Sequence, residues 1–317
     1  MTEKSSIGTD RQIPELLTAL KGRGEIPLKF EYLDEGASYW KDLVNSIEYG
    51  LGRIELDLIL ESVPSIARLI KKNRVSIIDV GCGSGEKGVA VTMELVVRGI
   101  EVNYAGLDIS ETMLEEAVHQ VKTVDKINNV EFHKVDFEEG NFAYITSTMR
   151  KVHDCDNILL LLGHTLGNPA DKNRLLTNLR ESMTVDDYII IGVELVEHQQ
   201  TNSIVHHYQN EKLYTVIFNV LSKLGVQRSD GHFDIQFNIT RGQVEMKFIF
   251  DKLVSIEYGG ETIRFETGDK VLLGVSYKFT KRGLHNLLEN TGFRIKSFML
   301  NNSEDYALVI CQIKIIR

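Results

Sequence analysis

The stretch Asp79-Val80-Gly81-Cys82-Gly83-Ser84-Gly85 decides the fold, because it places three glycines directly after an apolar run, Val75–Val80. Short runs rich in β-branched residues are typical of buried strands. Glycine lets the backbone turn tightly and approach a ligand closely where a Cβ would clash. A second apolar run, Val102–Leu107, ends in Asp108. The sequence therefore predicts a strand, a glycine-rich turn and a helix, with a carboxylate delivered by the next strand.

Glycine-rich turns of this kind bind nucleotide cofactors, and two details distinguish the candidates. A dinucleotide-binding fingerprint has a third glycine three residues after the second, whereas Gly83 is followed three residues later by Glu86. A glutamate would also repel a pyrophosphate, which S-adenosylmethionine lacks. Asp108 is placed to accept both ribose hydroxyls in charge-assisted hydrogen bonds, or else it caps the helix near Glu111. The turn therefore indicates an S-adenosylmethionine site.

The remaining residues of this predicted site follow along the chain. The third apolar run is followed by Asp136-Phe137, where class I methyltransferases often hold the adenine. Lys87 is either a solvated lysine of the first helical turn or a ligand of the cofactor carboxylate. The predicted cofactor-binding residues are Gly81, Gly83, Ser84, Lys87, Asp108, Asp136 and Phe137.

Apolar runs alternate with segments of helical period through much of the chain. The runs are Val75–Val80, Val102–Leu107, Val130–Val135, Asn157–Leu162, Tyr188–Val193 and Tyr306–Ile316, and the helical segments include Lys87–Val97, Glu111–Val121 and Asp171–Met183. Such alternation predicts a parallel sheet covered on both faces. The last run forms a hairpin with Phe293–Met299. We therefore expect an α/β fold, a class I Rossmann-like methyltransferase sheet with a C-terminal antiparallel hairpin.

The region from about residue 196 to 279 breaks this alternation and predicts a second, α+β lobe. A polar helical stretch is followed by strand-like runs at Phe233–Thr240, Gln243–Phe250, Lys252–Tyr258 and Thr262–Phe265. We expect residues 54–197 and 280–317 to form the cofactor-binding domain. Residues 1–53 and 198–279 are then expected to form a substrate-binding lobe.

Composition narrows the class of partner. Acidic residues outnumber basic ones, 45 to 36, for a net charge of −9. Nucleic-acid binders usually concentrate positive charge, so a small or neutral substrate is favoured. Cys82, Cys155 and Cys311 form no C-x-x-C pair, and His206-His207 lacks a third ligand at metal-binding spacing, so neither a disulfide framework nor a metal site is expected. The absence of signal-peptide and membrane-length patterns predicts a cytoplasmic protein without membrane contact.

Several segments, in order along the chain, resemble the histidine-specific methyltransferase family, which includes the enzyme that trimethylates histidine on the way to ergothioneine. They are Tyr32-Leu33-Asp34-Glu35-Gly36, Ile47-Glu48-Tyr49, Gly81-Cys82-Gly83-Ser84-Gly85-Glu86-Lys87, Gly163-His164-Thr165-Leu166-Gly167-Asn168, Gly192-Val193-Glu194-Leu195-Val196, Phe218-Asn219, Val244-Glu245-Met246 and Val275-Ser276-Tyr277-Lys278-Phe279. The resemblance implies a second lobe that presents a free amino acid to the methyl donor.

The resemblance also implies roles for individual residues. The carboxylate-binding asparagine of the family falls on Asn168 and its tyrosine partner on Tyr208, and an amide and a phenol can hold a carboxylate by neutral hydrogen bonds. A further active-site tyrosine falls on Tyr49. The tyrosine near the amine falls on Tyr32, which would accept the proton of the amine directly or through water. The residues around the substrate side chain are Met246 and Ser276. Taken alone, Asn168 could cap the helix after Pro169, and Tyr49 or Met246 could be core residues.

One position departs from the family pattern. Histidine-methylating members place a glutamate two residues before the serine of the Ser-x-Lys-Phe piece, and this chain has Gly274 there. Loss of that carboxylate removes a charge-assisted hydrogen bond to the imidazole, worth about 1.5–3 kcal/mol. Glycine at this position resembles the fungal branch that N-methylates a prenylated tryptophan. We therefore expect an amino acid other than histidine, with a larger or apolar side chain such as an indole.

Three functions fit these observations. The first is an N-methyltransferase acting on the amino group of a free amino acid or derivative, with histidine itself retained as an alternative despite Gly274. The second is a methyltransferase acting on another nitrogen, such as a guanidine, or on a metabolite that is not an amino acid. The third is a silent cofactor-binding protein. The number of methyl groups transferred and the oligomeric state do not follow from the sequence.

Overall fold

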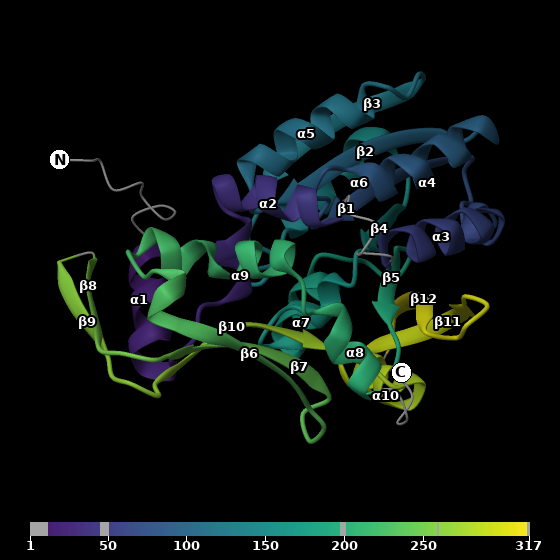
Figure 1. Ribbon diagram of the computed structural model, residues 1–317. Coiled ribbons are helices and arrows are strands. Elements are labelled where there is room, and N and C mark those ends of the chain that lie inside the picture. The colour runs from purple at the N-terminus through teal and green to yellow at the C-terminus, as the bar shows by residue number, and fades with distance from the viewer. Residues whose placement is uncertain (1–11, 45–50, 197–200, 259, 316–317) are drawn as a thin grey trace. The chain divides into compact units, whose positions relative to one another are not determined.

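The computed structural model describes residues 12–44, 51–196, 201–258 and 260–315 of the 317-residue chain (Figure 1). The chain forms two compact units, each built from two separate stretches of sequence. The first unit comprises Met1–Tyr49 and His198–Lys278, and the second comprises Gly50–Glu197 and Phe279–Arg317. No helix among the described residues has the length and apolar character needed to cross a membrane.

The second unit contains a seven-stranded sheet in the order β11-β12-β5-β4-β1-β2-β3. Its strands are β1 (Arg74–Val80), β2 (Glu101–Asp108), β3 (Ile127–Lys134), β4 (Asn157–Leu161), β5 (Tyr188–Glu194), β11 (Phe293–Leu300) and β12 (Tyr306–Ile313). Strands β1 to β5 pair in parallel, whereas β12 pairs antiparallel with β5 and β11. The predicted α/β class and C-terminal hairpin are confirmed. The strand order reverses between β1 and β4, which is where open α/β sheets bind their ligands.

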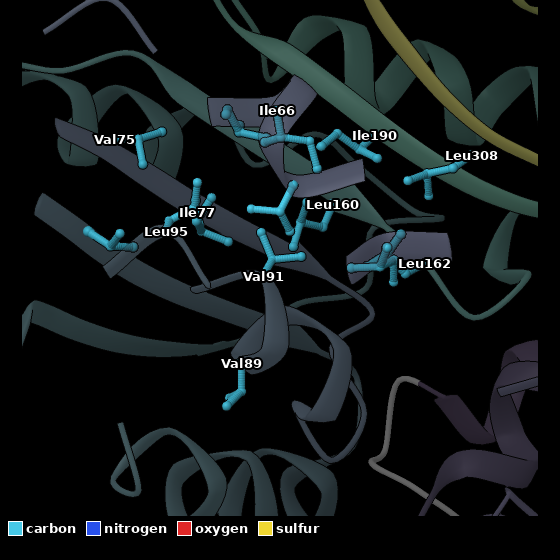
Figure 2. Close-up of a cluster of buried hydrophobic side chains, with 14 of the residues drawn as sticks. Ile66, Val75, Ile77, Val89, Val91, Leu95, Leu160, Leu162, Ile190 and Leu308 are labelled. Atoms are coloured by element: carbon cyan, nitrogen blue, oxygen red, sulfur yellow. The ribbon is translucent and has the colours of Figure 1, made fainter. Parts of the chain in front are cut away.

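A buried apolar cluster packs one face of this sheet against helices α3 (Leu51–Ala67) and α4 (Glu86–Val97). Figure 2 shows Ile77 of β1, Leu160 of β4 and Val91 of α4 within the cluster. Successive strand residues face opposite sides, so Ile78 lies on the other face, where it is also fully buried. Each such side chain contributes about 1.5–3 kcal/mol by its burial. Strand β1 is therefore buried on both faces, and this fixes the point from which the glycine turn departs.

The other helices of this unit are α5 (Glu111–Val121), α6 (Ala143–His153), α7 (Lys172–Glu181) and α10 (Lys281–Asn290), with a short 3₁₀ helix η2 (Thr165–Gly167). Helix α5 begins at Ser110, whose hydroxyl accepts a hydrogen bond from a first-turn amide, and α7 begins in the same way at Asp171. Neither Asp108 nor Asn168 is therefore the N-cap of the helix that follows it. The capping interpretation, which the sequence left open for both residues, is wrong.

The first unit contains a three-stranded antiparallel sheet in the order β10-β7-β6 and a two-stranded β8-β9 ribbon. Its elements are α1 (Gln12–Arg23), η1 (Leu28–Tyr32), α2 (Glu35–Val44), α8 (Thr201–His207), α9 (Glu211–Lys223), η3 (Arg228–Asp230), β6 (Gly231–Asn238), β7 (Gln243–Phe250), β8 (Val254–Tyr258), β9 (Glu261–Phe265) and β10 (Lys270–Tyr277). The ring of Phe218 on α9 lies 4.9 Å from that of Phe248 and 5.7 Å from that of Phe233. An aromatic core thus joins α9 to the sheet.

Strand β10 was not among the predicted strands, although it carries two of the predicted site residues, Gly274 and Ser276. It pairs antiparallel with β7, and its register shifts between Leu272 and Gly274. A bulge and a central glycine interrupt the period-two pattern by which strands are recognised. The sequence therefore assigned Gly274 and Ser276 to a family motif but did not predict that they lie on a strand.

Candidate active site

The glycine turn between β1 and α4 has the conformation that the sequence predicted. Gly81, Gly83 and Gly85 have φ angles of 68°, 54° and 83°, in the left-handed region that favours glycine. A Cβ on Gly81 would lie 3.3 Å from the ring of Phe137, and one on Gly85 would lie 3.1 Å from Ala117. A Cβ on Gly83 would meet no protein atom within 4 Å. The turn is therefore closely packed on two sides and open at Gly83.

Asp108 ends β2 and binds the glycine turn directly. One carboxylate oxygen accepts a hydrogen bond from the amide of Gly83 and the other accepts one from the amide of Ser110, both at 2.9 Å. The side chain is buried, and burial raises its pKa above the ordinary value. Each oxygen of an ionised carboxylate accepts more than one hydrogen bond, so both retain capacity for a ligand hydroxyl.

Lys87 is not a solvated lysine. Its ammonium forms an ion pair with Glu55 of α3, and its side chain is 21% exposed. Glu55 is almost fully buried, and both of its carboxylate oxygens lie 2.9 Å from the amide nitrogen of Gly163, which donates to them. Sequence reasoning missed Glu55, since a glutamate on a helix usually faces solvent.

The segment after β3 contacts the turn through Phe137, whose ring lies against Gly81. Asn178 of α7 holds this segment by donating hydrogen bonds to the carbonyl groups of Phe137 (2.9 Å) and Glu138 (3.1 Å). A carboxylate oxygen of Asp136 accepts a hydrogen bond from the amide of Glu138 at 3.1 Å. Ser84 lies in the turn and is half-buried.

Asn168 follows η2 in the segment after β4 and is half-buried. The segment is anchored by His164, whose Nδ1 accepts a hydrogen bond from the amide of Glu194 at 3.0 Å. A Cβ on Gly167 would lie 2.2 Å from Nε2 of His164, so this position requires glycine. His164 therefore has a structural role in shaping the segment that carries Asn168.

In the first unit, Tyr208 and Ser276 form a hydrogen-bonded chain with a buried lysine. The hydroxyl of Tyr208 donates to Oγ of Ser276 at 2.8 Å, and the ammonium of Lys278 donates to the Tyr208 hydroxyl at 2.7 Å. Lys278 is only 5% exposed. The sequence interpretation treated Tyr208 as part of an uncharged pair with Asn168. The structure instead places a buried cation against this phenol, and the signal for it was Lys278 within the Ser-Tyr-Lys-Phe piece.

Gly274 and Met246 are directly paired residues of β10 and β7. A Cβ on Gly274 would lie 3.0 Å from Cε of Met246 and 3.0 Å from Cδ1 of Leu28, both of which are buried. Ser276 lies two residues further along β10 and shares the face of Gly274. The structure thus brings together Met246, Gly274, Ser276 and Tyr208, and adds Leu28, which the sequence had not singled out.

Tyr32 ends η1 and stacks on Trp40 of α2, with ring centroids 4.9 Å apart. The preceding residue, Glu31, is fully buried and accepts a hydrogen bond from the amide of Val220 at 3.2 Å. Burial holds the pKa of Glu31 well above its usual range. The remaining predicted residue, Tyr49, lies outside the described residues.

Residues 10–313 match the profile of the histidine-specific, S-adenosylmethionine-dependent methyltransferases. The chain belongs to this family. The predicted family, enzyme class and cofactor are confirmed, and the chain is a methyltransferase that uses S-adenosylmethionine to methylate nitrogen. Among its residues that the structure describes, no group of three or more His, Cys, Asp or Glu side chains is arranged to hold a metal ion.

This methyltransferase is similar to several fungal proteins over most of its length. The 4-dimethylallyltryptophan N-methyltransferase of Claviceps fusiformis is 23% identical over 91% of this chain and 88% of that protein. Ergothioneine biosynthesis protein 1 of Schizosaccharomyces pombe is 21% identical over 98% of this chain and 42% of that protein. Among solved structures, the magnesium protoporphyrin IX methyltransferase of Synechocystis with bound SAH covers 90% of this chain at 13% identity, with a TM-score of 0.47.

The residues around the glycine turn of the second unit are chemically suited to S-adenosylmethionine, the cofactor of the family. The open position at Gly83 gives a ligand access to the backbone, and Asp108 beside it has acceptor capacity for hydroxyl groups. The carboxylate of Asp108 beside the turn disfavours a phosphate there, because it repels an anion. S-adenosylmethionine supplies a methyl group from a sulfonium centre, and transfer of that methyl group leaves a neutral thioether.

Asp79, at the end of β1, makes the stability of this methyltransferase depend on pH. Burial raises the pKa of Asp79 from 3.8 to about 7. The hydrogen bond from the Tyr104 hydroxyl (2.7 Å) and the charge of Lys87 lower this pKa, whereas the negative charges of Asp108 and Glu55 raise it. Because the pKa is higher in the folded than in the unfolded chain, the stabilisation is complete below about pH 4 and is lost as the pH rises through about 7.

Asp79→Asn is therefore expected to remove part of the pH dependence of unfolding. Asparagine resembles the protonated acid and keeps an acceptor for Tyr104. The unfolding free energy of the variant should rise relative to the parent chain by about 2–3 kcal/mol between about pH 5 and pH 8. Urea unfolding of the ligand-free protein across this range measures the difference. Asp125→Asn, at an exposed turn, should run parallel to the parent chain. Parallel curves for Asp79→Asn would show that Asp79 is ionised throughout.

Proposed function

We propose that this enzyme methylates the amino group of a free amino acid, or a derivative of one, whose side chain is more apolar than that of histidine. This proposal rests on the apolar environment of Gly274. The methyl ends of Leu28 and Met246 face the position where a Cβ would stand. An imidazole at this wall would lose a charged hydrogen-bond partner, which is worth about 1.5–3 kcal/mol, whereas an apolar side chain would gain from burial.

We further propose that the first unit is the substrate-binding lobe. Tyr208, Ser276 and Met246 support this role, because the family resemblance assigns all three to the acceptor and the structure brings them together. Asn168 and Tyr208 would bind the acceptor carboxylate, with the Tyr208 hydroxyl donating to the acceptor in place of Ser276. The ammonium of Lys278 donates a hydrogen bond to the Tyr208 hydroxyl, and this contact fixes the position of the phenol. For Tyr49, the family resemblance alone supports a proposed contact with the substrate.

Methyl transfer to an amine requires an uncharged nitrogen in line with the methyl group, so positioning supplies much of the rate. We propose that Gly81, Gly83, Ser84, Lys87, Asp108, Asp136 and Phe137 hold the methyl donor. Desolvation of the acceptor ammonium lowers its pKa. Tyr32, held by its stacking on Trp40, would then accept the proton directly or through water.

The test is a panel of free amino acids and prenylated tryptophan, each incubated with the enzyme and S-adenosylmethionine and analysed by mass spectrometry. Indole-bearing acceptors should be methylated with kcat/KM at least about tenfold above that of histidine, because a hydrogen-bonding ring without its partner is strongly disfavoured. Fragmentation of the product locates the methyl group. Methylation of a side-chain nitrogen, or a preference for histidine, would overturn the proposal.

Gly274→Glu provides the matched variant for this panel. The new side chain must displace Leu28 and Met246, whose methyl groups lie 3.0 Å from the position of its Cβ. The kcat/KM for the indole acceptor should fall by about tenfold or more, since about 1–3 kcal/mol is lost when a packed site is overfilled. Gly274→Ala, which adds only the Cβ, should retain most of the activity. Equal activity of Gly274→Glu and the parent chain would show that the acceptor side chain lies elsewhere.

A further inference from the structure

Glu55 is a buried carboxylate that the methyl-transfer chemistry does not itself require. It lies on α3, is 1% exposed, and has both oxygens 2.9 Å from the amide nitrogen of Gly163. Its second partner is the ammonium of Lys87 on α4. One side chain therefore joins α3 to the first turn of α4 and to the segment after β4.

Space for this carboxylate is built into the neighbouring backbone. A Cβ on Gly192 of β5 would lie 2.0 Å from Oε1 of Glu55, a distance that no real contact allows. A Cβ on Gly163 would lie 3.2 Å from the nitrogen of Lys87. Two glycines thus leave room for a charged pair where an apolar side chain would fill the core without the cost of desolvation. Stability alone does not account for this arrangement.

Lys87, whose ammonium pairs with Glu55, is two residues beyond the last glycine of the turn. Lys87 has three N–H donors, and Glu55 fixes the direction of the group that carries them. On the basis of the proposed role of Lys87 in holding the methyl donor, we propose that Glu55 is a positioning residue: anchored by the Gly163 amide, it holds the Lys87 ammonium in place to bind the donor carboxylate. A flexible lysine would lose rotamer freedom on binding that carboxylate, and the ion pair removes this cost in advance.

Glu55→Gln tests the proposal, because glutamine keeps an acceptor for Gly163 and loses the charge that holds Lys87. Calorimetry with S-adenosylhomocysteine, which has the amino-acid carboxylate, should show a Kd raised by about tenfold or more. The Kd of 5′-methylthioadenosine, which lacks that part of the donor, should change by less than about twofold. Glu61→Gln makes the same substitution at an exposed position of α3 and should alter neither Kd.

Lys87→Met, and the double variant that combines it with Glu55→Gln, complete a double-mutant cycle. If Glu55 acts through Lys87, the double variant should bind S-adenosylhomocysteine no more weakly than Lys87→Met, since the effects of coupled residues do not add. Lys87→Met leaves a buried charge without its partner, so it should unfold at a lower temperature than the double variant. Should Lys87→Met not fold, the double variant still supplies the comparison with Glu55→Gln.

Two outcomes would overturn the proposal. An unchanged Kd of S-adenosylhomocysteine in folded Glu55→Gln would show that Glu55 has only a structural role. An equal loss of affinity for both nucleosides would show that the substitution distorts the glycine turn. These measurements concern donor binding alone, so they are independent of which amine the enzyme methylates.

Discussion

Asp108→Asn is expected to weaken the binding of S-adenosylhomocysteine by about a hundredfold. The carboxylate accepts hydrogen bonds from the amides of Gly83 and Ser110, one at each oxygen. Asparagine replaces one oxygen with an NH₂ group, which would then face an amide donor. The variant also loses the charge that would strengthen the proposed hydrogen bonds to the ribose hydroxyls, each worth about 1.5–3 kcal/mol.

Calorimetric titration of the purified variant measures this loss, and Glu111→Gln is the matched control. Glu111 begins α5, three residues after Asp108, and its side chain is 74% exposed in a surface ion pair with Lys134. Surface pairs of this kind contribute little, so the control should bind as the parent chain does. An Asp108→Asn variant that binds within about threefold of the parent would exclude Asp108 as a ligand of the ribose.

The parallel sheet was predictable from sequence because its central strands are buried on both faces. Ile77 and Ile78 of β1 are both fully buried, so the strand appears in the sequence as a continuous apolar run between turn residues. The glycine turn was predictable for a related reason, because its left-handed φ angles favour glycine. In both cases the decisive information lies within a few consecutive residues.

The parts of the site that depend on distant contacts were not predictable in this way. Lys87 was ambiguous because its partner, Glu55, comes from another helix. Glu31 and Glu55 are buried carboxyl groups that read as surface residues in a sequence, since carboxylates are seldom fully buried. Lys278 similarly donates a hydrogen bond to Tyr208, which is seventy residues away in the sequence. Charge burial depends on the tertiary fold, and no local pattern records it.

The acceptor site depended on family resemblance, and the structure explains why. In the sequence Gly274 shows only that a glutamate of the family is missing, whereas its neighbours Leu28 and Met246 come from η1 and β7 and are known only from the structure. The bulge in β10 hides the strand that carries it. The resemblance proposes the positions of the acceptor site, and the structure supplies the chemical environment of those residues.

Asn168→Ala is expected to lower kcat/KM for the acceptor by about a hundredfold, the effect of losing a hydrogen bond to a charged group. Donor affinity should remain intact, because Asn168 supplies neither the glycine turn nor the carboxylate of Asp108. The variant should also fold, since Asp171 rather than Asn168 caps α7. The φ angle of −94° at Asn168 suits alanine as well.

Steady-state kinetics with the best acceptor of the panel, together with calorimetry of S-adenosylhomocysteine, separate the two halves of the reaction. Asn173→Ala makes the same substitution at an exposed position of α7 and should leave both measurements unchanged. If Asn168→Ala loses donor affinity and acceptor turnover together, the residue supports the segment between Gly163 and η2 and does not bind the acceptor. If turnover persists, the acceptor carboxylate is bound without it, and the buried Lys278 behind Tyr208 is the group to replace next.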